Sequence, residues 1–140
     1  MAKDPRVDRL RAVPLFSGCN DKHLAFIATR VDEVDVNAGR VLTEEGQSGG
    51  EFFIVVSGEA EVKRAAKAVD TIRAGDFFGE IALLDNGPRT ATVTATSPMR
   101  LLVLSHRQFQ DVLHSEPEIA ITLLHTVTKR LRRDAHLPAD

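Results

Sequence analysis

Residues 78–92 read Phe78-Gly79-Glu80-Ile81-Ala82-Leu83-Leu84-Asp85-Asn86-Gly87-Pro88-Arg89-Thr90-Ala91-Thr92. The segment holds a glycine at the expected start of a short helix, a carboxylate beside it and an arginine further along. A helix start offers unpaired backbone N–H groups and the positive end of the helix dipole, which together can hold an anion. Arg89 would supply the countercharge, so we interpret residues 78–92 as a pocket for one phosphate and one sugar.

Short strands are predicted on both sides of this segment. Four apolar or β-branched runs, separated by turn residues, occupy residues 51–56, 59–63, 91–95 and 101–104. Strands at a spacing of roughly 10 residues, joined by glycine turns, are typical of a barrel or a jelly roll. All nine glycines lie between Gly18 and Gly87, which indicates a turn-rich middle followed by a helical tail.

Helix-start signals flank the predicted strands. Asn20 follows Val13-Pro14-Leu15-Phe16 and is a suitable N-cap for a helix over residues 21–30. After the strands, two capping-box patterns each predict a helix start, Ser105-His106-Arg107-Gln108 and Ser115-Glu116-Pro117-Glu118. The second of these helices carries one apolar stripe, formed by Ala120, Leu124, Val127 and Leu131. We interpret the stripe as core packing, with a lid or a dimer seam as the alternatives.

These signals together predict a mainly β fold with flanking helices. We expect an antiparallel β jelly roll, or double-stranded β-helix, with an N-terminal helix, a short internal helix within residues 78–92 and two C-terminal helices. Residues 1–140 are expected to form a single domain. Its parts would be an N-terminal helical segment over 1–30, the β-roll over 31–104 and the C-terminal helices over 105–134.

The composition argues against several classes of protein. Hydrophobic residues make up 43% and charged residues 27% of the chain, as in ordinary globular proteins and unlike disordered ones. The net charge of -2 argues against a nucleic-acid partner, because nucleic-acid-binding domains usually carry a basic excess. No apolar run approaches the roughly 18 residues of a bilayer span, and the charged start does not resemble a signal peptide. The single cysteine, Cys19, cannot form an internal disulfide, so we expect a cytoplasmic protein.

The residues quoted above resemble a known family, the cyclic nucleotide-binding domains of the catabolite-activator and kinase regulatory-subunit type. Residues 78–84, followed by Pro88-Arg89-Thr90-Ala91-Thr92, look like the phosphate-binding cassette of that family. The resemblance extends from about residue 8 to 133 and includes Val13-Pro14-Leu15-Phe16, Gly39, Glu45-Gly46, Val56-Ser57-Gly58-Glu59-Ala60-Glu61-Val62 and Gly75-Asp76-Phe77. It implies a jelly roll that binds a 3′,5′-cyclic nucleotide as its ligand, with no cofactor and no catalytic residue.

The resemblance also implies roles for individual residues. Glu80 would accept a hydrogen bond from the ribose 2′-hydroxyl, and the planar fork of Arg89 would bind two oxygens of the cyclic phosphate. The other candidate positions are the backbone amides near Gly79, Ile81 and Ala82, the hydroxyl of Thr90, the apolar walls Val62 and Ile72 beside the base, and Arg130 as a cap over the purine.

Each of these roles has a plainer alternative. In a protein without this ligand, Glu80 and Arg89 would form a surface salt bridge. Val62 and Ile72 would then be core residues, and Arg130 would be a solvated arginine in the last helix.

The function expected from the resemblance is that of a cytoplasmic, non-enzymatic receptor module. Its ligand would be cyclic AMP in preference to cyclic GMP, although Thr90 suits both purines because a hydroxyl can donate or accept. Closure of the C-terminal helix would be the signal, received by an unknown effector protein or domain. The module would act on a separate partner or belong to a longer chain, and its last helix allows a homodimer. Neither nucleic acid nor a membrane is expected as a partner.

Two other functions remain open from the sequence. A degenerate domain of the same fold would bind no nucleotide and would act through protein contacts. Gly46-Gln47-Ser48-Gly49-Gly50 matches the G-x-S-x-G motif of serine hydrolases, but that motif needs a helix after it, whereas residues 51–56 are strand-like. A plain glycine turn is the simpler interpretation. A metal site is not expected, since the five histidines show no H-x-x-x-H or H-x-H spacing.

Overall fold

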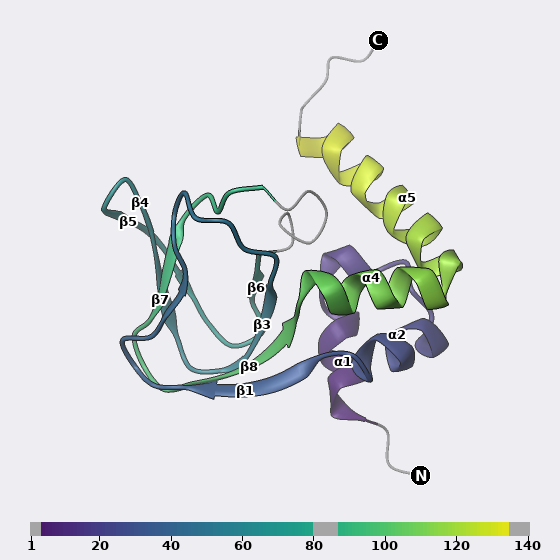
Figure 1. Ribbon diagram of the computed structural model, residues 1–140, viewed down its shortest axis with the longest axis horizontal. Helices are drawn as coiled ribbons and strands as arrows, with labels where there is room; N and C mark the ends of the chain where they lie inside the picture. Colours follow the sequence, from purple (N-terminus) through teal and green to yellow (C-terminus); the bar gives the residue numbers. More distant parts are fainter. Residues whose placement is uncertain (1–3, 80–86, 135–140) are drawn as a thin grey trace. The chain divides into compact units, whose positions relative to one another are not determined.

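The computed structural model describes residues 4–79 and 87–134, without the side chains of Arg130, Leu131, Arg133 and Asp134. The chain forms two compact units (Figure 1). We call Arg30–Phe109 the β unit, and Met1–Thr29 together with Gln110–Asp140 the helical unit. The short internal helix expected within residues 78–92 falls largely on residues 80–86, outside the described residues.

The β unit contains two antiparallel sheets of four strands each. The strands are β1 (Asp32–Val36), β2 (Val41–Thr43), β3 (Phe52–Ser57), β4 (Ala60–Arg64), β5 (Lys67–Ile72), β6 (Phe77–Phe78), β7 (Thr92–Ala95) and β8 (Met99–Leu104). One sheet has the order β1-β8-β3-β6 and the other has the order β2-β7-β4-β5. The predicted mainly antiparallel β fold with flanking helices is therefore confirmed.

The two sheets share one hydrophobic core. Alternate residues of each strand point inward, as the two-residue period of a β-strand requires. The first sheet contributes Phe53 and Val55 from β3 and Met99, Leu101 and Val103 from β8. The second sheet contributes Ala60, Val62, Ile72, Ala91, Val93 and Ala95 to the same cluster. The sheets thus pack face to face around these side chains.

The turn between β4 and β5 has an unfavourable sequence for its conformation. Ala65 and Ala66 form the two-residue loop and both have positive φ angles, 50° and 66°. Such a type I′ turn normally holds Asn-Gly or a similar pair, because alanine in the left-handed region brings Cβ close to the following carbonyl oxygen. Glu45 supports the turn, since its Oε1 accepts a hydrogen bond of 2.9 Å from the Ala65 N–H.

Replacing the second alanine of this turn should therefore stabilise the protein. Ala66→Gly is expected to raise the free energy of unfolding by about 0.5–1 kcal/mol, because relief of the left-handed strain exceeds the entropy that glycine adds to the unfolded chain. Urea denaturation measures the change. Ala68→Gly in the exposed part of β5 is the control and should lower stability. A lower midpoint for Ala66→Gly than for the parent would contradict the prediction.

The helical unit begins with more helix than the sequence predicted. Besides α2 (Asp21–Ala28), which was expected over residues 21–30, it contains α1 (Pro5–Arg11) and the 3-10 turn η1 (Pro14–Phe16). The helix expected over 21–30 is confirmed as α2, whereas α1 was not predicted because it is short and rich in charge, so that its apolar period is weak. Its N-terminal signals are nevertheless present, since Asp4 is the N-cap and Pro5 the first helical residue.

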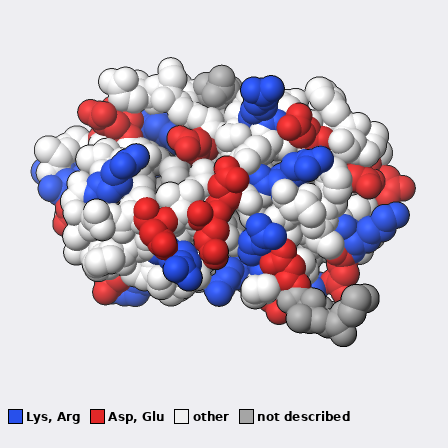
Figure 2. Space-filling view, turned by 60° about the horizontal axis from the view of Figure 1, so that its bottom comes forward, with Lys and Arg blue, Asp and Glu red and all other residues white. Residues whose placement is uncertain are grey.

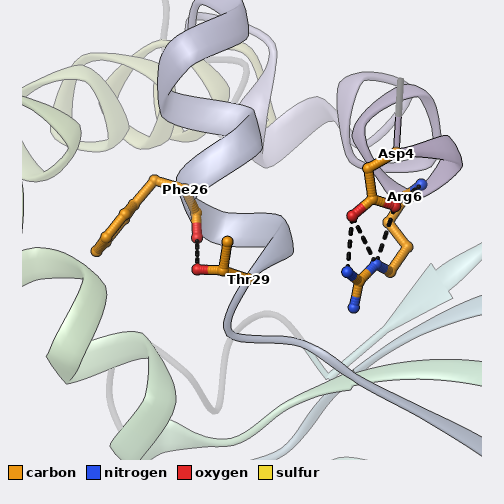
Figure 3. Close-up of polar contacts among 4 residues, drawn as sticks. All are labelled: Asp4, Arg6, Phe26 and Thr29. Atoms are coloured by element: carbon orange, nitrogen blue, oxygen red, sulfur yellow. Dashed lines mark hydrogen bonds and ion pairs between the residues drawn. The ribbon is translucent and has the colours of Figure 1, made fainter. Parts of the chain in front are cut away.

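Side-chain hydrogen bonds close the ends of these helices (Figure 3). The Asp4 carboxylate accepts from the Arg6 guanidinium at 2.7 Å and also from the Arg6 backbone N–H at 3.0 Å. At the other helix, Asn20 accepts from the His23 backbone N–H, and the Thr29 hydroxyl donates to the Phe26 carbonyl at 2.6 Å. The bonds from the Arg6 and His23 N–H groups satisfy donors that a helix start leaves without an intrahelical partner.

One of the two predicted capping boxes is confirmed and the other is wrong. Before α4 (His106–Ser115), the Ser105 hydroxyl accepts from the Gln108 N–H at 3.1 Å, while Gln108 Oε1 accepts from the Ser105 N–H at 2.7 Å. Ser115, however, is the last residue of α4, and α5 (Pro117–Asp134) begins two residues later. Proline suits the first helical position, so Glu116 precedes the helix in place of the serine.

The interpretation of the apolar stripe of α5 as core packing is wrong for Leu124. Ile119 and Leu123 are the buried positions, at 0% and 3% exposure, whereas Leu124 is 64% exposed. The buried face also carries threonines: a Cβ added to Gly18 would lie 2.9 Å from Thr122 Cγ2. Thr122 and Thr126 interrupt the apolar spacing on the buried face of α5. The sequence therefore showed a more regular apolar spacing on the neighbouring face, which includes Leu124.

The surface of the described residues carries charges of both signs. Lys and Arg side chains are interspersed with Asp and Glu side chains over the face in Figure 2, as the net charge of -2 would suggest. Among the described residues, no helix is both long enough and apolar enough to cross a membrane.

Candidate functional site

A hollow of about 530 Å³ opens in the β unit. One wall is formed by β4 and β5, including Val62, Ile72 and the segment 69–71. The other wall is formed by residues 76–79 and 87–91. Of the predicted ligand-binding residues, the hollow brings together Val62, Ile72, Gly79, Arg89 and Thr90. A concave site of this size, with apolar walls and a few polar groups, is typical of a small-molecule pocket.

Arg89 is held in this wall through its main chain. Its N–H donates to the Gln47 carbonyl at 2.9 Å, and its carbonyl accepts from the Gly46 N–H, also at 2.9 Å. Ser48 and Pro88 form an antiparallel bridge next to these bonds. The loop before β3 thereby fixes the backbone from which the arginine side chain extends.

The guanidinium of Arg89 is buried beside an uncharged acceptor. Only 8% of the residue is exposed, and its Nη2 donates to the main-chain carbonyl of Glu51 at 2.8 Å. Burial lowers the pKa of Arg89, and the negative charge of Glu51 partly opposes this shift. The group still carries its charge at neutral pH, because the ordinary pKa of an arginine lies far above neutrality. A buried cation of this kind is well placed to bind an anion.

Gly79 leaves room for this arrangement. Its φ angle of 88° lies in the left-handed region that favours glycine. A Cβ at this position would lie 2.5 Å from the Glu51 carbonyl oxygen and 3.0 Å from Arg89 Nη1. Any side chain at position 79 would therefore crowd both the buried guanidinium and its acceptor.

Val62 and Ile72 form the apolar wall opposite Arg89. They are 9% and 7% exposed, and they belong to the hydrophobic core while also lining the hollow. The sequence left two alternatives for Val62 and Ile72, a place in the core or a place in the pocket wall. The structure shows that both side chains pack in the core and also line the hollow. Ala60 pairs with Ile72 and Val62 pairs with Asp70 across the strands, which places these residues on one face of the sheet.

The sequence predictions missed several residues at this site. Four polar residues, Thr43, Arg64, Asp70 and Thr71, also line the hollow. Asp70 could have been found from the alternation in β5, because it lies two residues before Ile72 and thus on the same face. The Glu51 carbonyl is a main-chain atom, and no sequence pattern indicates its contact with Arg89.

Part of the predicted site lies outside the described residues. Glu80, Ile81 and Ala82 belong to the segment 80–86, and the side chain of Arg130 is likewise not described. Thr90 is exposed at the edge of the hollow. Within the described segments, no group of three or more His, Cys, Asp or Glu residues could hold a metal ion.

Ser48 does not lie in the turn that the hydrolase motif requires. It is an exposed residue that bridges to Pro88, and the chain continues into strand β3 and not into a helix. The sharp strand-to-helix turn that presents a nucleophilic serine is therefore missing around Ser48. The main chain of Gly46 and Gln47, in the Gly46–Gly50 run, instead forms part of the support of Arg89.

Two antiparallel sheets that enclose a hollow with a buried arginine define a small ligand-binding module. The model of a family described as cyclic nucleotide-binding domain matches residues 33–116. The chain belongs to this family, as its resemblance predicted. In this family the cyclic nucleotide acts as a ligand, and no cofactor is indicated.

The relatives are regulatory proteins. A cAMP-dependent protein kinase regulatory subunit of Eremothecium gossypii is 34% identical over 90% of this chain and 27% of that protein. A cyclic nucleotide-gated potassium channel of Rhizobium etli is 38% identical over 85% of this chain and 33% of the channel. A CRP-like cAMP-activated global transcriptional regulator of Mycobacterium tuberculosis is 28% identical over 90% of this chain and 58% of that protein. The chain thus spans about a quarter to somewhat over a half of these relatives.

Solved structures share the fold. The N-terminal domain of a transcriptional regulator from Streptomyces coelicolor is 33% identical, with a TM-score of 0.86 over 95% of this chain and 99% of that domain. The Thermus thermophilus catabolite activator protein has a TM-score of 0.71 over 88% of this chain and 60% of that protein, at 24% identity. The predicted jelly roll is therefore the fold of this family.

Proposed function

We propose that the hollow of the β unit binds a 3′,5′-cyclic nucleotide, with cyclic AMP preferred over cyclic GMP. The observation that carries this proposal is the charged, buried guanidinium of Arg89 beside a neutral carbonyl in a wall of the hollow. A cyclic phosphate would place a negative charge directly at the guanidinium and could accept two parallel hydrogen bonds. The preference for cyclic AMP is supported by two relatives, a kinase subunit that is cAMP-dependent and a CRP-like regulator that is cAMP-activated.

The proposed contacts extend from the phosphate to the base. Arg89 and the backbone amides near Gly79, Ile81 and Ala82 bind the phosphate, and Glu80 binds the ribose 2′-hydroxyl. The base lies against Val62 and Ile72, at the wall where Asp70 and Thr71 also line the hollow. Thr90 and Arg130 remain predicted contacts to the phosphate or purine edge and to the purine face.

The proposed activity is signalling without catalysis. Binding favours closure of the C-terminal helix, and an effector protein or domain in the cytoplasm responds to that closure. The ligand can shift this equilibrium only by as much as its affinity differs between the open and closed arrangements. A homodimer through α5 stays a prediction, supported by the exposed side chains of Ile121 and Leu124, at 58% and 64% exposure.

Thermal unfolding with and without nucleotide tests the proposal. A ligand that binds only the folded state at roughly 100 times its Kd adds about 2.7 kcal/mol to stability, so millimolar cyclic AMP should raise Tm clearly. Titration calorimetry should then give a lower Kd for cyclic AMP than for cyclic GMP. An equal or lower Kd for cyclic GMP would contradict the preference alone. No shift with either nucleotide would favour the degenerate domain that acts through protein contacts.

A further inference from the structure

The loop before β3 contains two glycines that are required for different reasons. Gly46 has a φ of 84°, and a Cβ there would meet nothing within 4 Å. Its backbone conformation therefore favours glycine, while the surrounding space does not require it. Gly49 is the opposite case, because its φ lies outside the left-handed region and its surroundings are crowded.

The crowding at Gly49 comes from a single side chain. A Cβ added there would lie 2.8 Å from Arg89 Nε, 3.1 Å from Nη2 and 3.3 Å from Cζ. The three nearest atoms thus all belong to the guanidinium group of Arg89. Position 49 is glycine because the buried arginine head occupies the space that a side chain would take.

We infer that Gly49 is a positioning residue for the Arg89 guanidinium. This inference rests on the proposed role of Arg89 in binding the ligand phosphate. The same loop holds the main chain of Arg89 through Gly46 and Gln47, and Glu51 at its end accepts from Nη2. Gly49 completes this support by allowing the head group to lie against the loop backbone, in the wall of the hollow.

A methyl group at position 49 should displace the arginine and leave the fold intact. The nearest atoms are at the far end of a long side chain that can turn away, whereas the nearest atom to a Cβ at Gly79 is a main-chain carbonyl. A displaced guanidinium would lose its aligned bond to Glu51 and its bidentate geometry toward a phosphate. Gly49→Ala should therefore weaken nucleotide binding with little loss of stability.

The test combines calorimetry with a thermodynamic cycle. Gly49→Ala is expected to raise the Kd for cyclic AMP by about tenfold or more, a coupling typical of residues in contact. In the Arg89→Ala background, the same change should leave the Kd as it is in Arg89→Ala alone. Ser48→Ala is the matched control, because it alters the same loop at an exposed residue and should bind like the parent. A Kd for Gly49→Ala within threefold of the parent, or an equal loss in both backgrounds, would overturn the inference.

A second measurement needs no ligand. In NMR spectra of the free protein, the Arg89 Nε–H signal can be assigned by its absence in Arg89→Ala. Gly49→Ala should shift or broaden this signal, while Ser48→Ala should leave it in place. An unchanged signal in Gly49→Ala would overturn the inference even if the nucleotide binds. If the parent binds no cyclic nucleotide, the proposed function fails while this measurement still decides the role of Gly49.

Thermal unfolding covers the case in which Gly49→Ala does not fold. If the clash is with the arginine head, Gly49→Ala combined with Arg89→Ala should fold as well as Arg89→Ala alone. That result would support the inference, because the alanine in place of Arg89 vacates the space. Failure of both the single and the double variant would place the clash elsewhere and contradict it.

Discussion

Arg89→Ala is expected to raise the Kd for the cyclic nucleotide by about thirtyfold to several thousandfold. The variant leaves the ligand phosphate in the hollow without its charged partner, and loss of one member of a buried charge pair costs about 2–5 kcal/mol. The free protein should keep its stability, because the substitution also removes a buried cation whose observed acceptor is the neutral Glu51 carbonyl. Titration calorimetry with cyclic AMP measures the effect.

Arg100→Ala is the matched control for this experiment. Arg100 also belongs to the β unit, but its side chain is 51% exposed and pairs with Asp35 at 3.0 Å. Its removal should change neither nucleotide affinity nor stability by much, because exposed ion pairs contribute little. A Kd for Arg89→Ala within threefold of the parent would contradict the proposed phosphate contact. A similar loss of nucleotide affinity in Arg100→Ala would indicate that the overall charge of the protein, and not a local bond from Arg89, determines the affinity.

The strands that could be predicted are those at the centres of the sheets. The runs at 51–56, 59–63, 91–95 and 101–104 correspond to β3, β4, β7 and β8, and each of these strands has neighbours on both sides. The unpredicted strands, β1, β2, β5 and β6, are the four edge strands. β1 reads Asp-Glu-Val-Asp-Val and is exposed along most of its length, so it lacks an apolar pattern. β1 and β5 carry charged residues, which disfavour the pairing with other chains that an apolar edge would invite. β2 and β6 are only three and two residues long, too short for a strand pattern.

The candidate site divides in a similar way. Arg89 and Gly79 were predicted because the cassette has a distinctive local sequence. Val62 and Ile72 were predicted because the resemblance to the family implies apolar walls at these positions. The support of Arg89 was not predicted, because it depends on contacts between residues 38 positions apart. Glu51 contributes a main-chain carbonyl, and Gly49 leaves space for the guanidinium because it has no side chain. The local sequence pattern indicates neither role. The loop at 46–50 was therefore interpreted as a plain turn.

Gly58→Ala is expected to destabilise the protein by about 2–5 kcal/mol. Gly58 has a φ of 93°, and its Cβ would lie 2.3 Å from the Pro98 carbonyl oxygen and 2.9 Å from Met99 Cα. Left-handed strain costs about 1–2 kcal/mol for alanine, and overpacking adds about 1–3 kcal/mol. These two atoms belong to the backbone, so no rotamer change can relieve their contacts, although the Met99 side chain, with Cγ at 2.8 Å, could move.

The surrounding hydrogen bonds prevent the two turns from moving apart. The Glu59 N–H donates to the Ser97 hydroxyl at 2.9 Å, and the Thr96 N–H donates to the Glu59 carbonyl at 3.0 Å. Separating the turn at Gly58 from the turn at Pro98 would break these bonds and disturb the β3–β8 register beside them. A small local shift cannot relieve the clash without breaking these bonds, so the substitution should lower the free energy of unfolding.

Gly39→Ala separates the steric part of this effect from the conformational part. Gly39 has the same φ of 93°, but a Cβ there would meet nothing within 4 Å. Its substitution should cost only the left-handed strain of about 1–2 kcal/mol. Urea denaturation of both variants gives the difference, which measures the clash with Pro98 and Met99. If Gly58→Ala loses no more stability than Gly39→Ala, then the close approach of these two turns does not constrain the fold.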